Sequence, residues 1–334
     1  MKVLAIQFRY FGDAALMAPA LRALREHDAA GTLHVLVAEE VAPLFQHLPW
    51  IDRVWGMPRR RGRATITECW PILSALRREH FDRSVDFGGN DRGAILSLLC
   101  GARERLGPRQ AGGFLGRRFC YSETVMPAEG SQHEIERNLH ILSAWRVPPP
   151  QSLALEIRAD PALADFAAKV LPEGRIVCHL ATTQPKKEWP LSSWAELYTK
   201  ASAAGLRLVF STGTGMRERL LLEQFCRMVP EAPVLAAVPE LGAYLAVLKR
   251  AAAFVSCDTG PLHFAAGLGV PTVGLFGATS AAQWAPLGPR HRVVQGSACQ
   301  CGGNTGVCLA RTHCMGAIAP DAVLRGIQEI FTAA

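Results

Sequence analysis

VSCDTGPLHFAAGLGVPTVGLFG, residues 255–277, gives the clearest structural signal in this 334-residue sequence. The apolar residues before Asp258 predict a buried strand, Thr259 and Gly260 predict a tight turn, and Pro261 suits the first turn of a helix. Apolar residues resume at Thr272–Phe276 and predict a second strand. Strand, loop, helix and strand in this order predict a βαβ unit and therefore a parallel sheet.

The same alternation runs through the rest of the chain. The predicted strands are residues 3–8, 33–37, 53–55, 82–86, 176–180, 206–211, 254–256 and 272–276. The predicted helices are residues 14–26, 65–79, 92–100, 133–145, 192–203, 216–228, 241–250, 261–267 and 320–331. We therefore expect an α/β fold made of parallel sheets.

A run of three prolines, Pro148–Pro150, and the polar residues that follow it predict a linker near the middle of the chain. A chain of 334 residues also suits two domains of roughly 150 residues each. We expect residues 1–155 and 156–334 to form two Rossmann-like domains that face each other across a cleft. In such sheets, ligands bind at the carboxyl ends of the strands.

Composition narrows the class of protein. Hydrophobic residues make up 49% of the chain and charged residues 19%, which fits a packed globular protein rather than a disordered or fibrous one. No apolar run approaches the ~20 residues of a membrane span, and Arg9 and Asp13 interrupt any signal-peptide core. We expect a cytoplasmic protein, and attachment to a membrane surface is compatible with this. The net charge of +7 fits an acidic partner such as a phosphorylated lipid, a nucleotide or a nucleic acid, and it equally fits a solvated surface.

Three segments place polar side chains after predicted strands. At the helix start after Asp258, free N–H groups can bind an anion, Gly260 admits a phosphate, and Asp258 can accept hydrogen bonds from sugar hydroxyls. The plainer interpretation is a helix cap followed by a buried His263. In TTQPKKEWP, residues 182–190, hydroxyls and lysines are suitable phosphate ligands, although this segment alone would favour a solvated turn. Gly12-Asp13 offers a carboxylate that could act as a base, although the local sequence alone favours a helix cap.

Taken together, these segments resemble the family 9 glycosyltransferases, the heptosyltransferases that build the inner core of lipopolysaccharide. KVLAIQFRYFGDAALMAPALRAL is similar to the N-terminal strand, Gly-Asp loop and first helix of that family. TTQPKKEWP resembles its Thr-Thr…Lys-x-Trp-Pro loop, and SCDTGPLHFAAGLGVPTVGLFG resembles its Asp-Thr-Gly…His signature. FDRSVDFGGNDRGAILSLLCGARERLG also resembles the family, so the likeness covers nearly the whole chain.

The resemblance implies a GT-B enzyme that transfers heptose from ADP-heptose with inversion and without a metal. The N-terminal domain would bind the acceptor and the C-terminal domain the donor. Asp13 matches the family's general base, and Lys187 matches its donor-phosphate lysine. The matching donor residues are Thr182, Thr183, Asp258, Thr259, Gly260 and His263, with Glu218 in a looser alignment. The implied acceptor is anionic and lipid-linked, either Kdo-lipid A or the first heptose, with peripheral contact to the inner membrane and no nucleic acid partner.

Two clusters extend this interpretation. Because arginine pairs well with phosphate and carboxylate, a basic run in the N-terminal half is the candidate acceptor clamp, and a solvated charge run is its alternative. The run consists of Arg59, Arg60, Arg61 and Arg63. The loop at residues 299–314 contains four thiols that could hold a structural zinc or iron, although Cys-x-Cys is not the usual Cys-x-x-Cys spacing. They are Cys299, Cys301, Cys308 and Cys314. Some relatives in the resembled family hold iron at such a loop; reduced thiols or a disulfide are the alternatives.

Other functions fit parts of the pattern. A related enzyme could modify another acceptor, such as a protein. A GT-B nucleotide-sugar epimerase would share the donor domain, and a non-catalytic nucleotide-binding module would share the fold. A dinucleotide dehydrogenase is disfavoured, because no G-x-G-x-x-G follows either leading strand.

Overall fold

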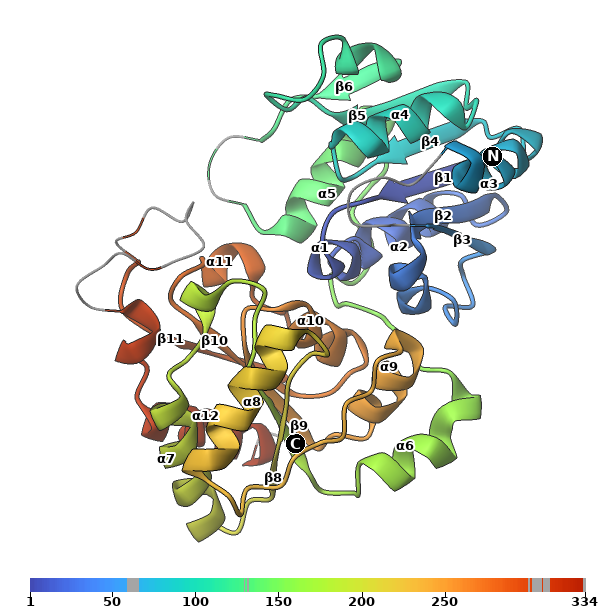
Figure 1. Cartoon of the computed structure of the whole chain (residues 1–334). Helices are drawn as coiled ribbons and strands as arrows, with labels where there is room; N and C mark the ends of the chain where they lie inside the picture. Colours follow the sequence, from blue (N-terminus) through green and yellow to red (C-terminus); the bar gives the residue numbers. More distant parts are fainter. Residues whose placement is uncertain are drawn as a thin grey trace. The chain divides into compact units, whose positions relative to one another are not determined.

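The computed structural model describes residues 1–58, 66–128, 130, 132–299, 301, 308 and 313–332. The chain forms two compact units, Met1–Arg158 (unit 1) and Ala159–Ala334 (unit 2). Each unit is a parallel sheet with helices between its strands, which confirms the predicted α/β class (Figure 1). No helix in the described part of the chain is both long and apolar enough to cross a membrane.

Unit 1 contains a parallel sheet in the order β3-β2-β1-β4-β5-β6. Its strands are β1 (Lys2–Gln7), β2 (Thr32–Ala38), β3 (Arg53–Met57), β4 (Arg83–Asp86), β5 (Glu104–Pro108) and β6 (Glu123–Val125). Its α-helices are α1 (Phe11–Ala15), α2 (Ala18–His27), α3 (Ile66–Arg78), α4 (Asp91–Leu99) and α5 (Glu134–Leu142). Short 3₁₀ turns lie at η1 (Glu39–Leu44), η2 (Arg117–Cys120) and η3 (Ser143–Trp145). Buried apolar runs in β1 and β2 fit a sheet that is covered on both faces.

Unit 2 repeats the plan with a sheet in the order β11-β10-β9-β7-β8. Its strands are β7 (Ile176–His179), β8 (Leu208–Ser211), β9 (Ala253–Cys257), β10 (Thr272–Phe276) and β11 (His291–Gln295). Its α-helices are α6 (Ala164–Val170), α7 (Leu191–Ala203), α8 (Met216–Met228), α9 (Leu241–Lys249), α10 (Gly260–Gly267), α11 (Ala281–Trp284) and α12 (Pro320–Thr332). Its 3₁₀ turns are η4 (Pro161–Leu163), η5 (Pro185–Lys187) and η6 (Cys314–Ala317).

Aromatic packing forms the centre of the unit 2 core. The rings of Trp189 and Trp194 meet edge to face with centroids 4.8 Å apart, and Phe210 packs against Phe225 at 4.3 Å. Trp189 is also tied to the chain's C-terminal part, because its indole N–H donates to the carbonyl of Ile318 at 3.1 Å. Large buried aromatic rings contribute strongly to core stability. The loop that ends at Trp189 is therefore fixed to a rigid core.

The predicted helix over residues 14–26 is two helices in the structure. α1 ends at Ala15 and α2 begins at Ala18. Pro19 lies in the first turn of α2 and has no N–H to donate to the carbonyl of Ala15. A continuous helix would leave that carbonyl without its partner, so the chain breaks between the two segments.

Candidate active site

The two sheets each reverse their winding direction at one point. In unit 2, β7 lies between β8 and β9, so the loops after β7 and β9 leave the sheet side by side at their carboxyl ends. In unit 1, the equivalent point lies between β1 and β4. Open α/β sheets bind ligands at such switch points. The predicted donor residues Thr182, Thr183 and Lys187 follow β7, and Asp258, Thr259 and Gly260 follow β9.

Lys187 and Asp258 form an ion pair at the unit 2 switch point. The Nζ of Lys187 lies 2.7 Å from Oδ2 of Asp258, and the two side chains are 19% and 8% exposed. Burial alone would raise the pKa of Asp258. His263 and the charge of Lys187 outweigh burial and lower the pKa to about 2. The site therefore holds Asp258 as a carboxylate at neutral pH, fixed against the side chain of Lys187.

The side chains before α10 are not used as helix caps. Thr259 occupies the N-cap position, but its side chain makes no capping hydrogen bond with the described residues, and Asp258 is committed to Lys187. His263 is buried, as the plainer interpretation expects. Its Nε2 lies 3.8 Å from Oδ1 of Asp258, and its Nδ1 has no hydrogen-bond partner among the described residues. The start of α10 thus presents backbone N–H groups beside polar side chains, an arrangement suited to an anion.

The two threonines after β7 have different environments. Thr182 is buried, and its hydroxyl donates to the carbonyl of Gln184 at 2.6 Å, so this side chain shapes the loop. Thr183 is exposed and can contact a ligand. The loop therefore has one hydroxyl that maintains its conformation and one that faces outward.

Glu188 and Arg217 connect this loop to α8, and the sequence analysis did not identify them. The guanidinium of Arg217 lies 2.7 Å from Oε1 of Glu188 and also donates to the carbonyl of Thr182. Glu188 in turn accepts the N–H of Thr182 at 3.1 Å. In the sequence, the only feature that points to these contacts is the opposite charge of the adjacent residues Lys187 and Glu188. The adjacent side chains of Lys187 and Glu188 therefore form ion pairs with different elements: Lys187 with the loop after β9, and Glu188 with α8.

Glu218 has a local structural role. Its Oε2 accepts the N–H of Gly215 at 3.0 Å, which completes the N-terminus of α8. A Cβ on Gly213 would lie 2.3 Å from the same carboxylate, so the turn before α8 is shaped around Glu218.

Asp13 lies after β1, at the unit 1 switch point, and is 7% exposed. It is the third residue of α1, whose N-cap is Tyr10, so Asp13 is not the cap that the plainer interpretation expects. Glu134 of α5 lies near it: burial raises the pKa of Glu134, Arg137 opposes that rise, and the charge of Asp13 adds to it. Asp13 is thus a buried carboxylate with a second carboxyl as neighbour.

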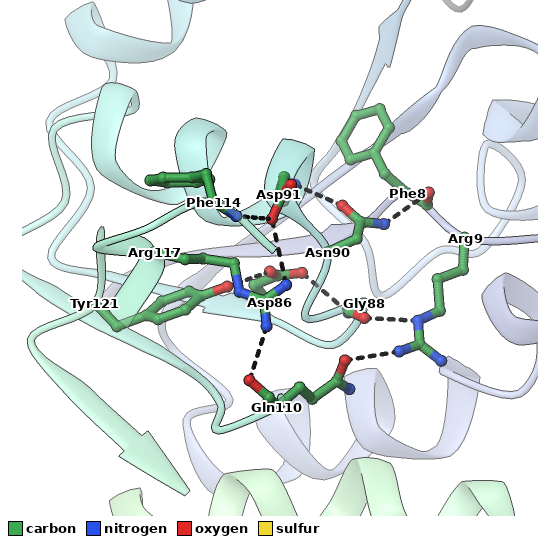
Figure 2. Close-up of polar contacts among 11 residues, drawn as sticks. Phe8, Arg9, Asp86, Gly88, Asn90, Asp91, Gln110, Phe114, Arg117 and Tyr121 are labelled. Atoms are coloured by element: carbon green, nitrogen blue, oxygen red, sulfur yellow. Dashed lines mark hydrogen bonds and ion pairs between the residues drawn. The ribbon is translucent and has the colours of Figure 1, made fainter. Parts of the chain in front are cut away.

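A polar network fills the carboxyl ends of β1, β4 and β5 (Figure 2). Asp86 ends β4, accepts the hydroxyl of Tyr121 at 2.6 Å, and accepts the N–H of Gly88 at 2.9 Å. Its burial raises its pKa to about 6 despite these bonds. Arg9 donates to the carbonyl of Gly88 at 2.6 Å and to Gln110 at 3.0 Å. The network holds the loops after all three strands together.

The structure describes only some residues of the two remaining predicted clusters, the arginine run and the loop cysteines. The arginine run Arg59, Arg60, Arg61 and Arg63 lies outside the described residues. Of the four loop cysteines, Cys299 and Cys301 have sulfur atoms 2.9 Å apart, and contact with Cys301 lowers the pKa of Cys299. Burial, with Cys299 nearby, raises the pKa of Cys314 to about 11. Within the described residues, no three His, Cys, Asp or Glu side chains are grouped as a metal site.

Known proteins share this fold. A glycosyl transferase family 9 structure from Veillonella parvula superimposes with a TM-score of 0.88 at 16% identity, covering 100% of this chain and 98% of the other. The structure of E. coli ADP-heptose lps heptosyltransferase II gives 0.80 at 19% identity, covering 100% and 99%. These likenesses establish the GT-B fold of two Rossmann-like units.

The family is established by sequence. The model of "Glycosyltransferase family 9 (heptosyltransferase)" matches residues 70–308, which is more than half of the chain. The chain therefore belongs to glycosyltransferase family 9, and it is a glycosyltransferase. Among curated proteins, lipopolysaccharide heptosyltransferase 3 of Escherichia coli is 23% identical over 295 residues, covering 83% of this chain and 84% of that protein.

Proposed function

We propose that this glycosyltransferase moves heptose from ADP-heptose, with inversion, onto the inner core of lipopolysaccharide, at Kdo-lipid A or the first heptose. Unit 2 would bind the donor and unit 1 the acceptor. Two relatives support this choice: one is an ADP-heptose lipopolysaccharide heptosyltransferase, and the other is a lipopolysaccharide heptosyltransferase. The observation that carries the proposal is the Lys187–Asp258 pair beside the start of α10, at the switch point of unit 2.

The donor half of the proposal follows from charge. A leaving nucleoside diphosphate gains negative charge as its bond to the sugar breaks. The ammonium of Lys187 and the N–H groups at the start of α10 can neutralise that charge. Thr183 and Thr259 offer hydroxyls, and Gly260 lets a phosphate approach the backbone closely. The carboxylate of Asp258 can accept hydrogen bonds from sugar hydroxyls, and the imidazole of His263 can donate or accept them. The ion pair holds Lys187 in place before the donor binds, so less ordering is needed during the reaction.

The acceptor half requires a base. The oxygen of an acceptor hydroxyl forms a bond to the anomeric carbon, the bond from that carbon to the diphosphate breaks, and the hydroxyl proton must leave. We assign that proton to the carboxylate of Asp13, which lies in α1, the first helix after β1. Assistance by a positioned base typically contributes ~10²–10⁴-fold in rate. The arginines of residues 59–63 would hold the phosphates and carboxylates of the acceptor.

A structural metal is a separate proposal. Thiolates suit zinc and iron, and the sulfur atoms of Cys299 and Cys301 already lie 2.9 Å apart. We infer that Cys299, Cys301, Cys308 and Cys314 can hold such an ion near η6. No catalytic step depends on it.

Two measurements test the enzyme assignment. ADP-heptose at a hundred times its dissociation constant should stabilise the protein by about 2.7 kcal/mol in thermal unfolding, whereas UDP- and GDP-sugars at the same concentration should not. Asp13→Asn should then fold and bind the donor normally and lose turnover by ~10²–10⁴-fold. Glu134→Gln, which alters the neighbouring buried carboxyl, is the matched control and should retain most activity. The reverse pattern would assign the base to Glu134, and normal turnover of Asp13→Asn would remove Asp13 from the mechanism.

A further inference from the structure

One ordered segment of unit 1 presents large apolar side chains to solvent. In Phe114–Phe119, which we name the FLGRRF segment, Leu115 is 103% exposed, Phe119 68% and Phe114 40%. Three glycines shape its backbone: Gly112, Gly113 and Gly116 have φ of +81°, +85° and +92°, a region that other residues rarely adopt. Exposing these apolar side chains to water on an ordered turn costs solvation free energy, so the segment is expected to bind a partner.

Polar contacts anchor the base of the FLGRRF segment. The backbone N–H of Phe114 donates to Asp91 at 3.3 Å, and Arg117 contacts Asp91 at 3.3 Å and the carbonyl of Gln110 at 2.8 Å. The segment is followed by Cys120, which is buried in one cluster with Ala94 of α4. Figure 2 shows the ring of Phe114 directed away from these contacts. The apolar tips are therefore held outward by a fixed base.

The neighbouring helix adds apolar surface. η2, which contains the second half of the segment, packs against α4. On α4, Ile95, Leu98 and Leu99 are 42%, 45% and 37% exposed. Their spacing of three and four residues puts them on one face of the helix. The exposed apolar area thus extends beyond a single side chain.

The charge around the segment identifies the partner's chemistry. Residues 101–119 contain five arginines and one glutamate. Of these arginines, Arg103, Arg109 and Arg118 are exposed, and the guanidinium of Arg118 lies 4.7 Å from the ring centroid of Phe119. Apolar tips surrounded by arginines match a surface of negative headgroups above an acyl layer. The tips enter the layer, and the arginines reach the phosphates.

We propose that the FLGRRF segment docks unit 1 onto an anionic lipid bilayer. Leu115 and Phe119 insert at the boundary between headgroups and acyl chains, and Arg118 binds lipid phosphates. This docking deepens the proposed function and rests on it for one point, the lipid-linked nature of the acceptor. It would bring the acceptor-binding unit to the surface where that acceptor lies.

Vesicle sedimentation tests the docking without any acceptor. The wild-type chain should bind vesicles of phosphatidylglycerol and phosphatidylcholine, and bind phosphatidylcholine alone much less. The double variant Leu115→Ser/Phe119→Ser should partition at least tenfold more weakly, which is about 1.4 kcal/mol. Arg118→Gln should lose about fivefold, on the anionic vesicles only. The matched control, Leu220→Ser/Phe331→Ser, removes two other exposed side chains, 49% and 44% exposed, and should bind as the wild type does.

Other outcomes would overturn the proposal. Equal vesicle binding by the double variant, or no binding by the wild type, would show that the segment does not dock on lipid. Dimers that the double variant abolishes would identify a second copy of the chain as the partner instead. Turnover separates docking from the proposed function: with a lipid-free, water-soluble acceptor the double variant should match the wild type, and with vesicle-embedded acceptor it should be slower. Vesicle binding without any turnover from ADP-heptose would retain the docking and reject the proposed function.

Discussion

Replacing Lys187 by methionine should destabilise unit 2 because it isolates a buried charge. Methionine keeps the unbranched apolar stem and removes the ammonium that lies 2.7 Å from Oδ2 of Asp258. The carboxylate is 8% exposed, so water cannot replace the lost partner fully. Burial, which already acts to raise the pKa of Asp258, would then be opposed by His263 alone. We expect the pKa of Asp258 to rise and the protein to unfold at lower urea concentration.

The size of the effect follows from the pKa. The environment of Asp258 lowers its pKa from 3.8 to about 2. At about 1.4 kcal/mol for each pH unit, the shift corresponds to about 2 kcal/mol, shared between Lys187 and His263. Because the folded-state pKa is lowered, this contribution is fully present above about pH 4 and is lost as the pH falls towards 2. We therefore expect a coupling of about 1–2 kcal/mol between Lys187 and Asp258 at pH 7.

A double-mutant cycle measures this coupling. Urea unfolding at pH 7 would compare the wild type with Lys187→Met, Asp258→Asn and the double variant. Lys200 and Asp321 supply the matched control, because their charged atoms also lie 2.7 Å apart but their side chains are 34% and 56% exposed. Exposed pairs couple weakly, so the control cycle should give a much smaller value. Equal coupling in the two cycles, or additive effects at the first, would refute the argument from burial.

Three further predictions concern other parts of the molecule. Changing the arginine run to glutamine should raise the acceptor KM and flatten its salt dependence, because exposed charges are screened by salt; an unchanged KM at low salt would place the clamp elsewhere. The run is Arg59, Arg60, Arg61 and Arg63. Protein purified without chelator should contain zinc or iron that is lost in Cys299→Ser/Cys308→Ser, and metal-free protein with four titratable thiols would contradict this. Because the pKa of Asp86 is raised from 3.8 to about 6, the stability of unit 1 should fall by about 3 kcal/mol as the pH rises from about 4 to above 6; Asp86→Asn should flatten that slope in urea unfolding, and an unchanged slope would assign it to another group.

The central strands of both units could be predicted because they are buried on both faces. β1, β7 and β9 read as continuous apolar runs, and a turn or polar loop follows each. The prediction missed β5, β6 and β11 for physical reasons, and β6 is an edge strand of only three residues. β5 contains Glu104, Arg105, Gly107 and Pro108, and β11 is an edge strand with exposed positions. Edge pairing depends on a neighbouring strand, which short-range pattern does not reveal.

The sequence indicated which polar residues follow predicted strands, but it did not indicate which of them contact one another. The sequence indicated Asp258 and Lys187 as separate polar residues after strands, and their pairing across 71 residues depends on β7 lying beside β9. The same holds for Arg217 and Glu188, which are 29 residues apart. The local sequence favoured a helix cap for Asp13 and offered one as an equal explanation for Asp258. In the structure neither aspartate is the N-cap residue: the N-cap of α1 is Tyr10, three residues before Asp13, and the N-cap of α10 is Thr259, one residue after Asp258.

Both units have a buried carboxyl near the switch point of a parallel sheet, but the pKa of that carboxyl is shifted in opposite directions. In unit 2, burial acts against a carboxylate that an ammonium keeps charged, so the pKa of Asp258 falls to about 2. In unit 1, burial prevails over the hydrogen bonds of Tyr121 and Gly88, and the pKa of Asp86 rises to about 6. The unit 2 site thus presents a cation held ready for a phosphate, which suits a donor whose charge grows as it leaves. In unit 1, the carboxyl of Asp86 instead fixes the loops after β4 and β5 through its hydrogen bonds. Those loops support the arginines and apolar tips of the FLGRRF segment. The two sheets thus shift the pKa of a buried carboxyl in opposite directions at their switch points.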